Sequence, residues 1–175
     1  MSLSANHFEL FNLPVAFEID NTALAARYRD LQRSAHPDNY ANASEREQRL
    51  ALQTTAQINE AFQTLKDPML RARYLLELQG INLSDEKHTL KDVAFLMDQM
   101  ELRENLAEIM QKPQPFDVLN QFIDSLEKRT AAHVQQLAQA CAQAQWDAVV
   151  QLVQKLQFFK RIREEALDLE ETLDV

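Results

Sequence analysis

Residues 21–40 read NTALAARYRDLQRSAHPDNY, and this stretch decides the first part of the fold. Four apolar residues recur in it at helical spacing: Leu24, Tyr28, Leu31 and Ala35. One apolar stripe of this kind predicts a helix from Asn21 to Ala35. Asp20 directly precedes it and is placed to act as its N-cap. The sequence therefore predicts a capped amphipathic helix that packs through one face.

A cationic surface and a turn are predicted on the exposed side of this helix. At 100° per residue, Arg29 and Arg33 lie well away from the apolar stripe, and Arg27 flanks it. Pro37 cannot continue a helix and biases His36 away from the helical region, so the chain must turn after Ala35. We expect a rigid turn at His36-Pro37-Asp38 that presents its side chains beside the arginines.

Further helices are predicted on both sides of this one. A second long helix runs from about Ser44, its cap, to Leu65 and packs antiparallel to the first. Its inner face is expected to hold Leu52, Ala56, Asn59, Ala61 and Phe62. Asp67-Pro68 begins a short helix that ends at Leu78, because Gly80, the only glycine, stops it. A first short helix is expected at about His7 to Phe11.

The order of these signals resembles the J-domain family over residues 1–78. The matching positions are Phe8 to Leu13, Tyr28-Arg29, His36-Pro37-Asp38, Ile58 to Phe62, Leu65, Asp67, Arg71 and Tyr74. The resemblance implies that this region binds a DnaK-type chaperone and stimulates its ATP hydrolysis. It implies these chaperone-binding residues: Arg27, Tyr28, Arg29, Arg33, His36, Pro37 and Asp38. Ala25 and Asp30 stand where many general J domains carry basic residues, which implies a dedicated chaperone.

Composition narrows the class of protein. Residues 1–78 hold eight Lys and Arg against ten Asp and Glu, and the remainder holds ten against seventeen. Phosphate binding normally requires a basic surface, so no nucleic-acid partner is expected. No stretch approaches the roughly 20 apolar residues that span a bilayer, and no signal region is readable. One cysteine, Cys141, excludes an internal disulfide, and we expect a cytoplasmic protein with an inert, buried thiol.

Three antiparallel helices are predicted after a polar connector at residues 79–90. They cover about Lys91 to Lys112, Phe116 to Gln143 and Asp147 to Leu173. The second helix is expected to pack through Leu119, Phe122, Leu126, Leu137 and Cys141. The third is expected to pack through Leu152, Leu156, Phe159, Ile162, Leu169 and Leu173. The predicted fold is therefore all-α, with a J domain over 1–78, a linker over 79–90 and a three-helix bundle over 91–175.

The first bundle helix carries two apolar faces. One face holds Phe95, Leu102, Leu106 and Ile109. The other holds Leu96, Met97 and Met100, beside Glu101, Glu104 and Glu108. A methionine-rich stripe edged with carboxylates is typical of an adaptable binding surface. It is equally typical of a helix that packs on the J domain or on a second copy, so periodicity alone leaves both interpretations open.

Residues 95–104, FLMDQMELRE, together with the J domain, resemble the HscB family over nearly the whole chain. The resemblance implies a co-chaperone whose bundle holds the iron–sulfur scaffold protein IscU and delivers it to the chaperone HscA. It implies these scaffold-binding residues: Leu96, Met97, Met100, Glu101, Glu104, Glu108 and Phe158. It also implies that the chain holds no cofactor and no metal.

Two other functions remain as alternatives. The first is a J-domain co-chaperone with a different client, whose bundle serves dimerisation or general substrate holding. The second, more remote, is a helical phosphotransfer protein that uses His133, although a histidine at an interhelical seam is much commoner. An enzyme is not expected, because His36 has no serine or cysteine nucleophile at a recognisable spacing.

Overall fold

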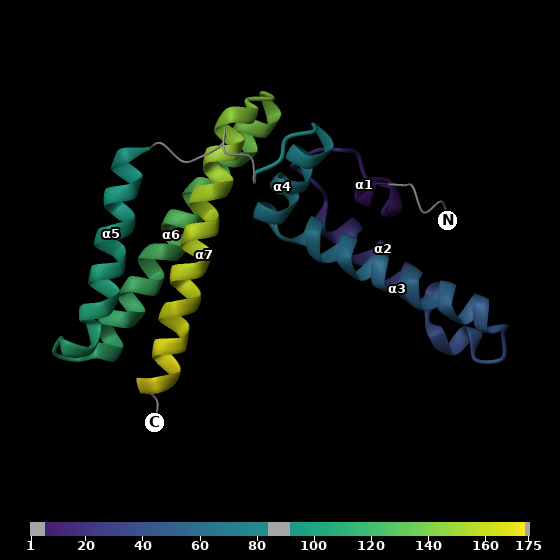
Figure 1. The fold of residues 1–175 in the computed structure, drawn as a ribbon, viewed down its shortest axis with the longest axis horizontal. Coiled ribbons are helices and arrows are strands. Elements are labelled where there is room, and N and C mark those ends of the chain that lie inside the picture. Colours follow the sequence, from purple (N-terminus) through teal and green to yellow (C-terminus); the bar gives the residue numbers. More distant parts are fainter. Residues whose placement is uncertain (1–5, 84–91, 174–175) are drawn as a thin grey trace. The chain divides into compact units, whose positions relative to one another are not determined.

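The structure is a computed structural model that describes residues 6–83 and 92–173. It divides into two compact units, Met1–Gly80 and Ile81–Val175. In both units the described residues form helices and connecting loops, without a strand (Figure 1). The all-α prediction is confirmed. No helix in the described part of the chain is long and apolar enough to cross a membrane.

The first unit is built around a helical hairpin. Its elements are α1 (His7–Leu10), α2 (Asn21–Ala35), the 3-10 turn η1 (Pro37–Tyr40), α3 (Glu45–Lys66) and α4 (Pro68–Leu78). Helices α2 and α3 pack side by side and antiparallel, and α1 and α4 both contact α3 (Figure 1). The predicted boundaries of these helices are matched to within about a residue.

Both predicted N-caps of the hairpin are confirmed. The Asp20 carboxylate accepts hydrogen bonds from the backbone N–H groups of Thr22 and Ala23, at 2.8 and 3.0 Å. Ser44 forms a reciprocal capping box with Glu47. These bonds satisfy N–H groups at the start of a helix that have no partner within it, so each cap fixes where its helix begins.

The predicted inner face of α3 is partly wrong. Leu52 and Ala56 are exposed, and Asn59 and Phe62 are half-buried. The buried residues of α3 are Ala51, Ile58, Ala61 and Leu65. This face is rotated by about one residue from the predicted one, because α3 must contact α1, α2 and α4 at once rather than α2 alone.

The second unit contains α5 (Val93–Glu108), the 3-10 turn η3 (Ile109–Gln111), α6 (Pro115–Ala142) and α7 (Trp146–Leu173). Helices α6 and α7 pack along each other, and α5 contacts α7. The predicted start at Lys91 and most of the predicted linker, residues 84–90, lie outside the described residues. Before them, Gly80 has a φ of 75°, a conformation that favours glycine and ends α4 cleanly. The predicted domain ranges 1–78, 79–90 and 91–175 remain predictions.

The bundle core differs in detail from the predicted one. Leu119, Leu126, Leu137, Leu156, Phe159 and Ile162 are buried as expected. Phe122, Cys141, Leu152 and Leu169 are only half-buried, and the side chain of Leu173 lies outside the described residues. Helix α7 buries further residues: Val149, Val150, Val153, Phe158 and Ala166. Its buried arc is wide because α7 packs against both α5 and α6.

Candidate functional sites

The turn after α2 holds two exposed, chemically distinct side chains. His36 caps η1, since its Nδ1 accepts a hydrogen bond from the backbone N–H of Asp38 at 3.3 Å. The Asp38 carboxylate lies 3.5 Å from the same nitrogen, and its side chain is 89% exposed. Pro37 occupies the first position of η1, where its fixed φ suits the turn. The local geometry therefore presents a carboxylate to solvent on a rigid support.

Side chains that the sequence reasoning missed hold this turn in place. The Asn39 side-chain amide donates to the carbonyl of Arg33 at 2.8 Å. The Thr55 hydroxyl, from α3, donates to the carbonyl of Ala35 at 3.0 Å. Carbonyls in the last turn of a helix have no partner within it, so these two bonds fix the end of α2. They also tie the turn to the neighbouring helix.

The three arginines of α2 are all exposed, as predicted. Arg33 approaches Asp30 at 3.9 Å, but both side chains are mostly exposed and the pair contributes little to stability. Arg27 and Arg29 likewise lie on the outside of the hairpin. The first unit therefore carries a cationic face on the helix that leads into the His36-Pro37-Asp38 turn.

Tyr28 is not on that exposed face. Its ring stacks on Phe62 of α3 with centroids 3.9 Å apart, and its hydroxyl donates to the Asn59 side chain at 2.9 Å. Gln32 also donates to the Asn59 side chain. Tyr28 thus packs in the α2–α3 interface, as its place on the apolar stripe predicts, and its place in the chaperone-binding set remains a prediction.

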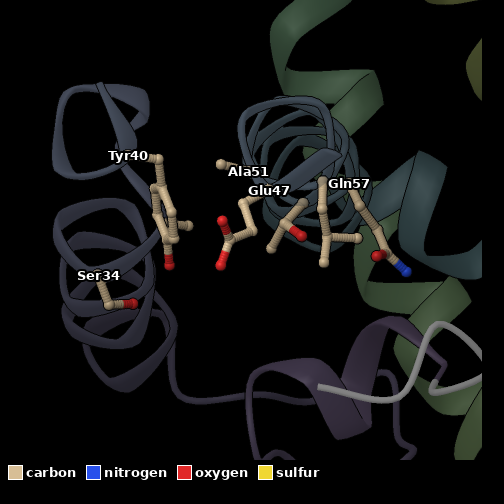
Figure 2. A pocket seen from close by; sticks show the side chains of 8 residues that line it. Ser34, Tyr40, Glu47, Ala51 and Gln57 are labelled. Carbon is tan, nitrogen blue, oxygen red and sulfur yellow. The ribbon is translucent and has the colours of Figure 1, made fainter. Parts of the chain in front are cut away.

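A groove of about 530 Å³ adjoins the turn. It lies between the end of α2, Tyr40 of η1 and one side of α3, and Glu47 projects into it from α3 (Figure 2). Hydrogen bonds from the Ser44 side chain and backbone hold the pKa of Glu47 below its usual value, so this carboxylate is charged. The exposed side chain of Leu50 adds an apolar wall. The sequence alone could not predict this groove, because its walls come from separate elements.

The second face of α5 is exposed to solvent. Leu96, Met97 and Met100 are 44%, 67% and 72% exposed. Their acidic neighbours Glu101, Glu104 and Glu108 are exposed too, whereas the opposite face is buried through Phe95, Leu102, Leu106 and Ile109. Val93, which the sequence reasoning missed, is also exposed and continues the stripe by one turn. We call Val93, Leu96, Met97 and Met100 the α5 apolar face.

Phe158 is separate from the α5 apolar face. Its ring is only 3% exposed and packs edge-on against Phe95 of α5, with centroids 5.7 Å apart. The Arg103 guanidinium covers it at 5.8 Å from the ring centroid. Phe158 therefore does not share the exposure of Leu96 and Met97, and its predicted part in scaffold binding remains a prediction. Its position beneath α5 suits it to supporting that helix.

Two cross-helix ion pairs fix α5 on the bundle. Arg129 of α6 pairs with Asp98 and lies over the Phe159 ring at 4.8 Å. Lys155 of α7 pairs with Asp92 at 2.7 Å, and the Asp92 side chain caps α5 at the N–H of Phe95. The hydrogen bonds from Lys155 and from this N–H lower the pKa of Asp92. The orientation of α5 therefore depends on charge as well as on apolar packing.

We expect Asp92→Asn to lower the thermal midpoint of unfolding at neutral pH. A carboxyl group with a lowered folded-state pKa stabilises the protein above its ordinary pKa, and this contribution is lost as the pH falls through the lowered value. The gap between wild type and Asp92→Asn should therefore shrink as the pH falls below about 4. Differential scanning calorimetry across pH 2–7 measures it, with Asp124→Asn as the control. A gap that stays constant with pH would contradict the role of the Asp92 charge.

His133 lies at the seam of the bundle. Its Nδ1 is 2.8 Å from the carbonyl oxygen of Arg129, and its ring packs edge-on against Phe159 at 5.0 Å. This half-buried placement between helices is the one expected of a seam histidine. Residues 6–83 and 92–173 contain no group of three or more His, Cys, Asp or Glu side chains suited to holding a metal ion.

Comparisons with known proteins cover both units. Residues 91–167 match a family model described as "HSCB C-terminal oligomerisation domain". The chain is 44% identical over 168 residues to "Co-chaperone protein HscB homolog" of Vibrio cholerae, which covers 96% of this chain and 98% of that protein. Among solved structures, "Chaperone HscB from Vibrio cholerae" is 42% identical with a TM-score of 0.86, covering 97% of this chain and 99% of that one. Human co-chaperone protein HscB is 25% identical with a TM-score of 0.86, covering 98% and 84%.

Proposed function

The chain belongs to the HscB co-chaperone family, and we propose that it works through two separate surfaces, one in each unit. It is a co-chaperone and not an enzyme. Its J domain binds the chaperone HscA and stimulates the ATPase of that partner, and its bundle binds the scaffold protein IscU and delivers it. The observation that carries the assignment of surfaces is the pairing of an exposed His36-Pro37-Asp38 turn with an exposed apolar face on α5.

The chaperone surface consists of Arg27, Arg29, Arg33, His36, Pro37 and Asp38. Its three arginines are exposed and precede a turn whose Asp38 carboxylate is held in solvent. This arrangement suits an acidic partner surface that has a cation at its centre. Tyr28 acts indirectly, because it sets the spacing of α2 and α3. The groove beside Tyr40 and Glu47 borders this surface and offers it additional contact area.

Replacing Arg29 and Arg33 together by alanine should slow association with HscA about tenfold at low salt. Exposed charges at the rim of an interface act mainly on the encounter rate and are screened as ionic strength rises. The variant should therefore show a weaker salt dependence than wild type when association is followed by stopped-flow or biolayer interferometry. IscU binding should not change.

The matched control for that variant is Lys160→Ala combined with Arg161→Ala. These two side chains are exposed on α7, so the control removes the same net charge from the other unit. Equal loss of salt sensitivity in both variants would indicate that net charge governs association, and would exclude α2 as the docking face.

The client surface is the α5 apolar face together with its rim of Glu101, Glu104 and Glu108. Exposed apolar anchors surrounded by polar groups have the composition of a protein interface. Phe158 belongs to this site as a support, since its buried ring packs against Phe95 beneath α5. The ion pairs of Asp92 and Asp98 hold the helix that presents the face.

Both surfaces belong to one chain, so a bound scaffold meets the chaperone in an effectively intramolecular step. Such tethering raises apparent affinity by about a hundredfold or more where the geometry allows both contacts. We place this delivery in the bacterial cytoplasm, in keeping with the bacterial relative.

A further inference from the structure

The most exposed residues of the α5 apolar face are methionines. Met97 and Met100 are 67% and 72% exposed, whereas Leu96, directly before Met97, is 44% exposed. The chain has five methionines. Of the others, Met69 is half-buried on α4, Met110 is exposed on η3, and Met1 lies outside the described residues. Among the four methionines that the structure describes, the two most exposed therefore lie on the surface proposed to hold the scaffold.

We propose that Met97 and Met100 are oxidation sites, and that their conversion to sulfoxides releases the scaffold. This inference rests on the proposed function of the α5 apolar face. In the reaction, a sulfur lone pair attacks one oxygen of hydrogen peroxide, the O–O bond breaks and an S–O bond forms. The other peroxide oxygen leaves as hydroxide and takes up the proton of the oxygen now bound to sulfur, which gives water. Sulfur loses two electrons and the peroxide gains them, so no further reactant is needed.

Oxidation at these positions changes the face from apolar to polar. A sulfoxide oxygen is a strong hydrogen-bond acceptor, and burying it in an interface without a donor is unfavourable. Glu101 and Glu104 follow Met97 and Met100 at a spacing of four residues, which places a carboxylate beside each sulfoxide on the helix surface. An ionised carboxylate can accept hydrogen bonds but cannot donate them, so Glu101 and Glu104 offer no donor to the sulfoxide oxygen.

The surroundings also select the class of oxidant. The second half of the chain carries most of the net negative charge, and Glu101 and Glu104 lie one helical turn from the two methionines. Anionic oxidants are repelled from such a surface, whereas neutral ones such as hydrogen peroxide and hypochlorous acid approach freely. Because both sulfurs are already exposed, oxidation requires no unfolding of the bundle.

The experiment uses the full chain, treated with limiting hydrogen peroxide and then desalted before it meets IscU. Peptide mass mapping identifies chains that carry a sulfoxide at both Met97 and Met100. For these chains, calorimetric titration should show IscU affinity at least about tenfold weaker than before oxidation, with an unchanged thermal midpoint. Stimulation of the HscA ATPase in the absence of scaffold should be unaffected.

Three variants test whether the sulfur atoms of Met97 and Met100 cause the loss of IscU affinity. Met97→Leu with Met100→Leu keeps apolar bulk without sulfur and should retain IscU binding after peroxide, although Cys141 and Met110 are still present. Met110→Leu should give no protection. Met97→Gln with Met100→Gln places a polar side chain at both positions and should reproduce the loss of affinity without any oxidant.

Retention of wild-type affinity by the doubly oxidised chain would overturn the inference, as would equal peroxide sensitivity in the double leucine variant. The proposed function has a separate readout. If the unoxidised wild type does not bind IscU, the client surface itself is wrong. If the unoxidised wild type binds and its oxidised form binds equally well, only the oxidation proposal is wrong.

Discussion

Asp38→Asn is expected to abolish stimulation of the HscA ATPase while leaving the fold intact. The Asp38 side chain is 89% exposed, and its carboxylate lies 3.5 Å from Nδ1 of the exposed His36 ring. Its backbone N–H still reaches His36 Nδ1 in the variant, and asparagine has nearly the same shape. The substitution therefore removes a charge from the surface and nothing from the core.

The expected loss of ATPase stimulation follows from the charge pair that the Asp38 carboxylate would form with a cation on the chaperone. Removing one partner of a buried interfacial charge pair costs about 2–5 kcal/mol, because the other charge is left unpaired. This corresponds to a loss of about thirtyfold to several thousandfold in coupling to the chaperone. Steady-state ATP hydrolysis by HscA, titrated with wild type and variant, measures the loss.

The control for this experiment is Asp124→Asn, which makes the same change of charge on the exposed surface of α6. It should stimulate HscA as wild type does. Circular dichroism, the thermal midpoint and IscU affinity should be the same for all three proteins. An Asp38→Asn protein that stimulates hydrolysis fully would show that the turn is not the contact that triggers the ATPase.

The sequence predicts the first unit well where the signals are local. Asp20 and Ser44 mark helix starts through their capping side chains and Pro68 through its fixed backbone, and all three starts are confirmed. The inner face of α3 was harder to predict. Its buried positions include Ala51 and Ala61, and alanine contributes little to an apolar pattern. Leu52 then looked like a core residue, although it is exposed.

In the candidate sites, too, features set within one helix could be predicted and contacts between helices could not. The two faces of α5 and the exposed arginines of α2 depend on spacing within one helix, and the structure places them as expected. The packing of Tyr28 follows from the apolar stripe of α2, but its specific contact with Phe62 depends on which side chains approach from another helix. The contact of Phe158 with Phe95 depends on the same thing. No periodicity within a single helix encodes those contacts. For the same reason Asn39 and Thr55, which hold the turn, could not be identified from sequence.

Replacing Leu96, Met97 and Met100 together by alanine is expected to remove IscU binding at nearly unchanged stability. Apolar anchors at the centre of an interface lose about 1–4 kcal/mol each on truncation. The triple variant should therefore bind at least about a hundredfold more weakly. Replacing the rim residues Glu101, Glu104 and Glu108 should cost less, since exposed ion pairs contribute roughly 0–1 kcal/mol each.

The same helix supplies the decisive control, because its opposite face is buried. Leu102→Ala should leave a cavity that costs about 2–5 kcal/mol, which lowers the thermal midpoint of a unit of this size by roughly 10 °C or more. Leu52→Ala, on the exposed side of α3, should change neither stability nor binding. If the triple variant instead melts like Leu102→Ala, the α5 apolar face packs within the protein. If the thermal midpoint of wild type depends on protein concentration and that of the triple variant does not, the face packs against a second copy. Lost affinity with a preserved midpoint leaves the client as the occupant, because truncating largely exposed side chains opens little cavity.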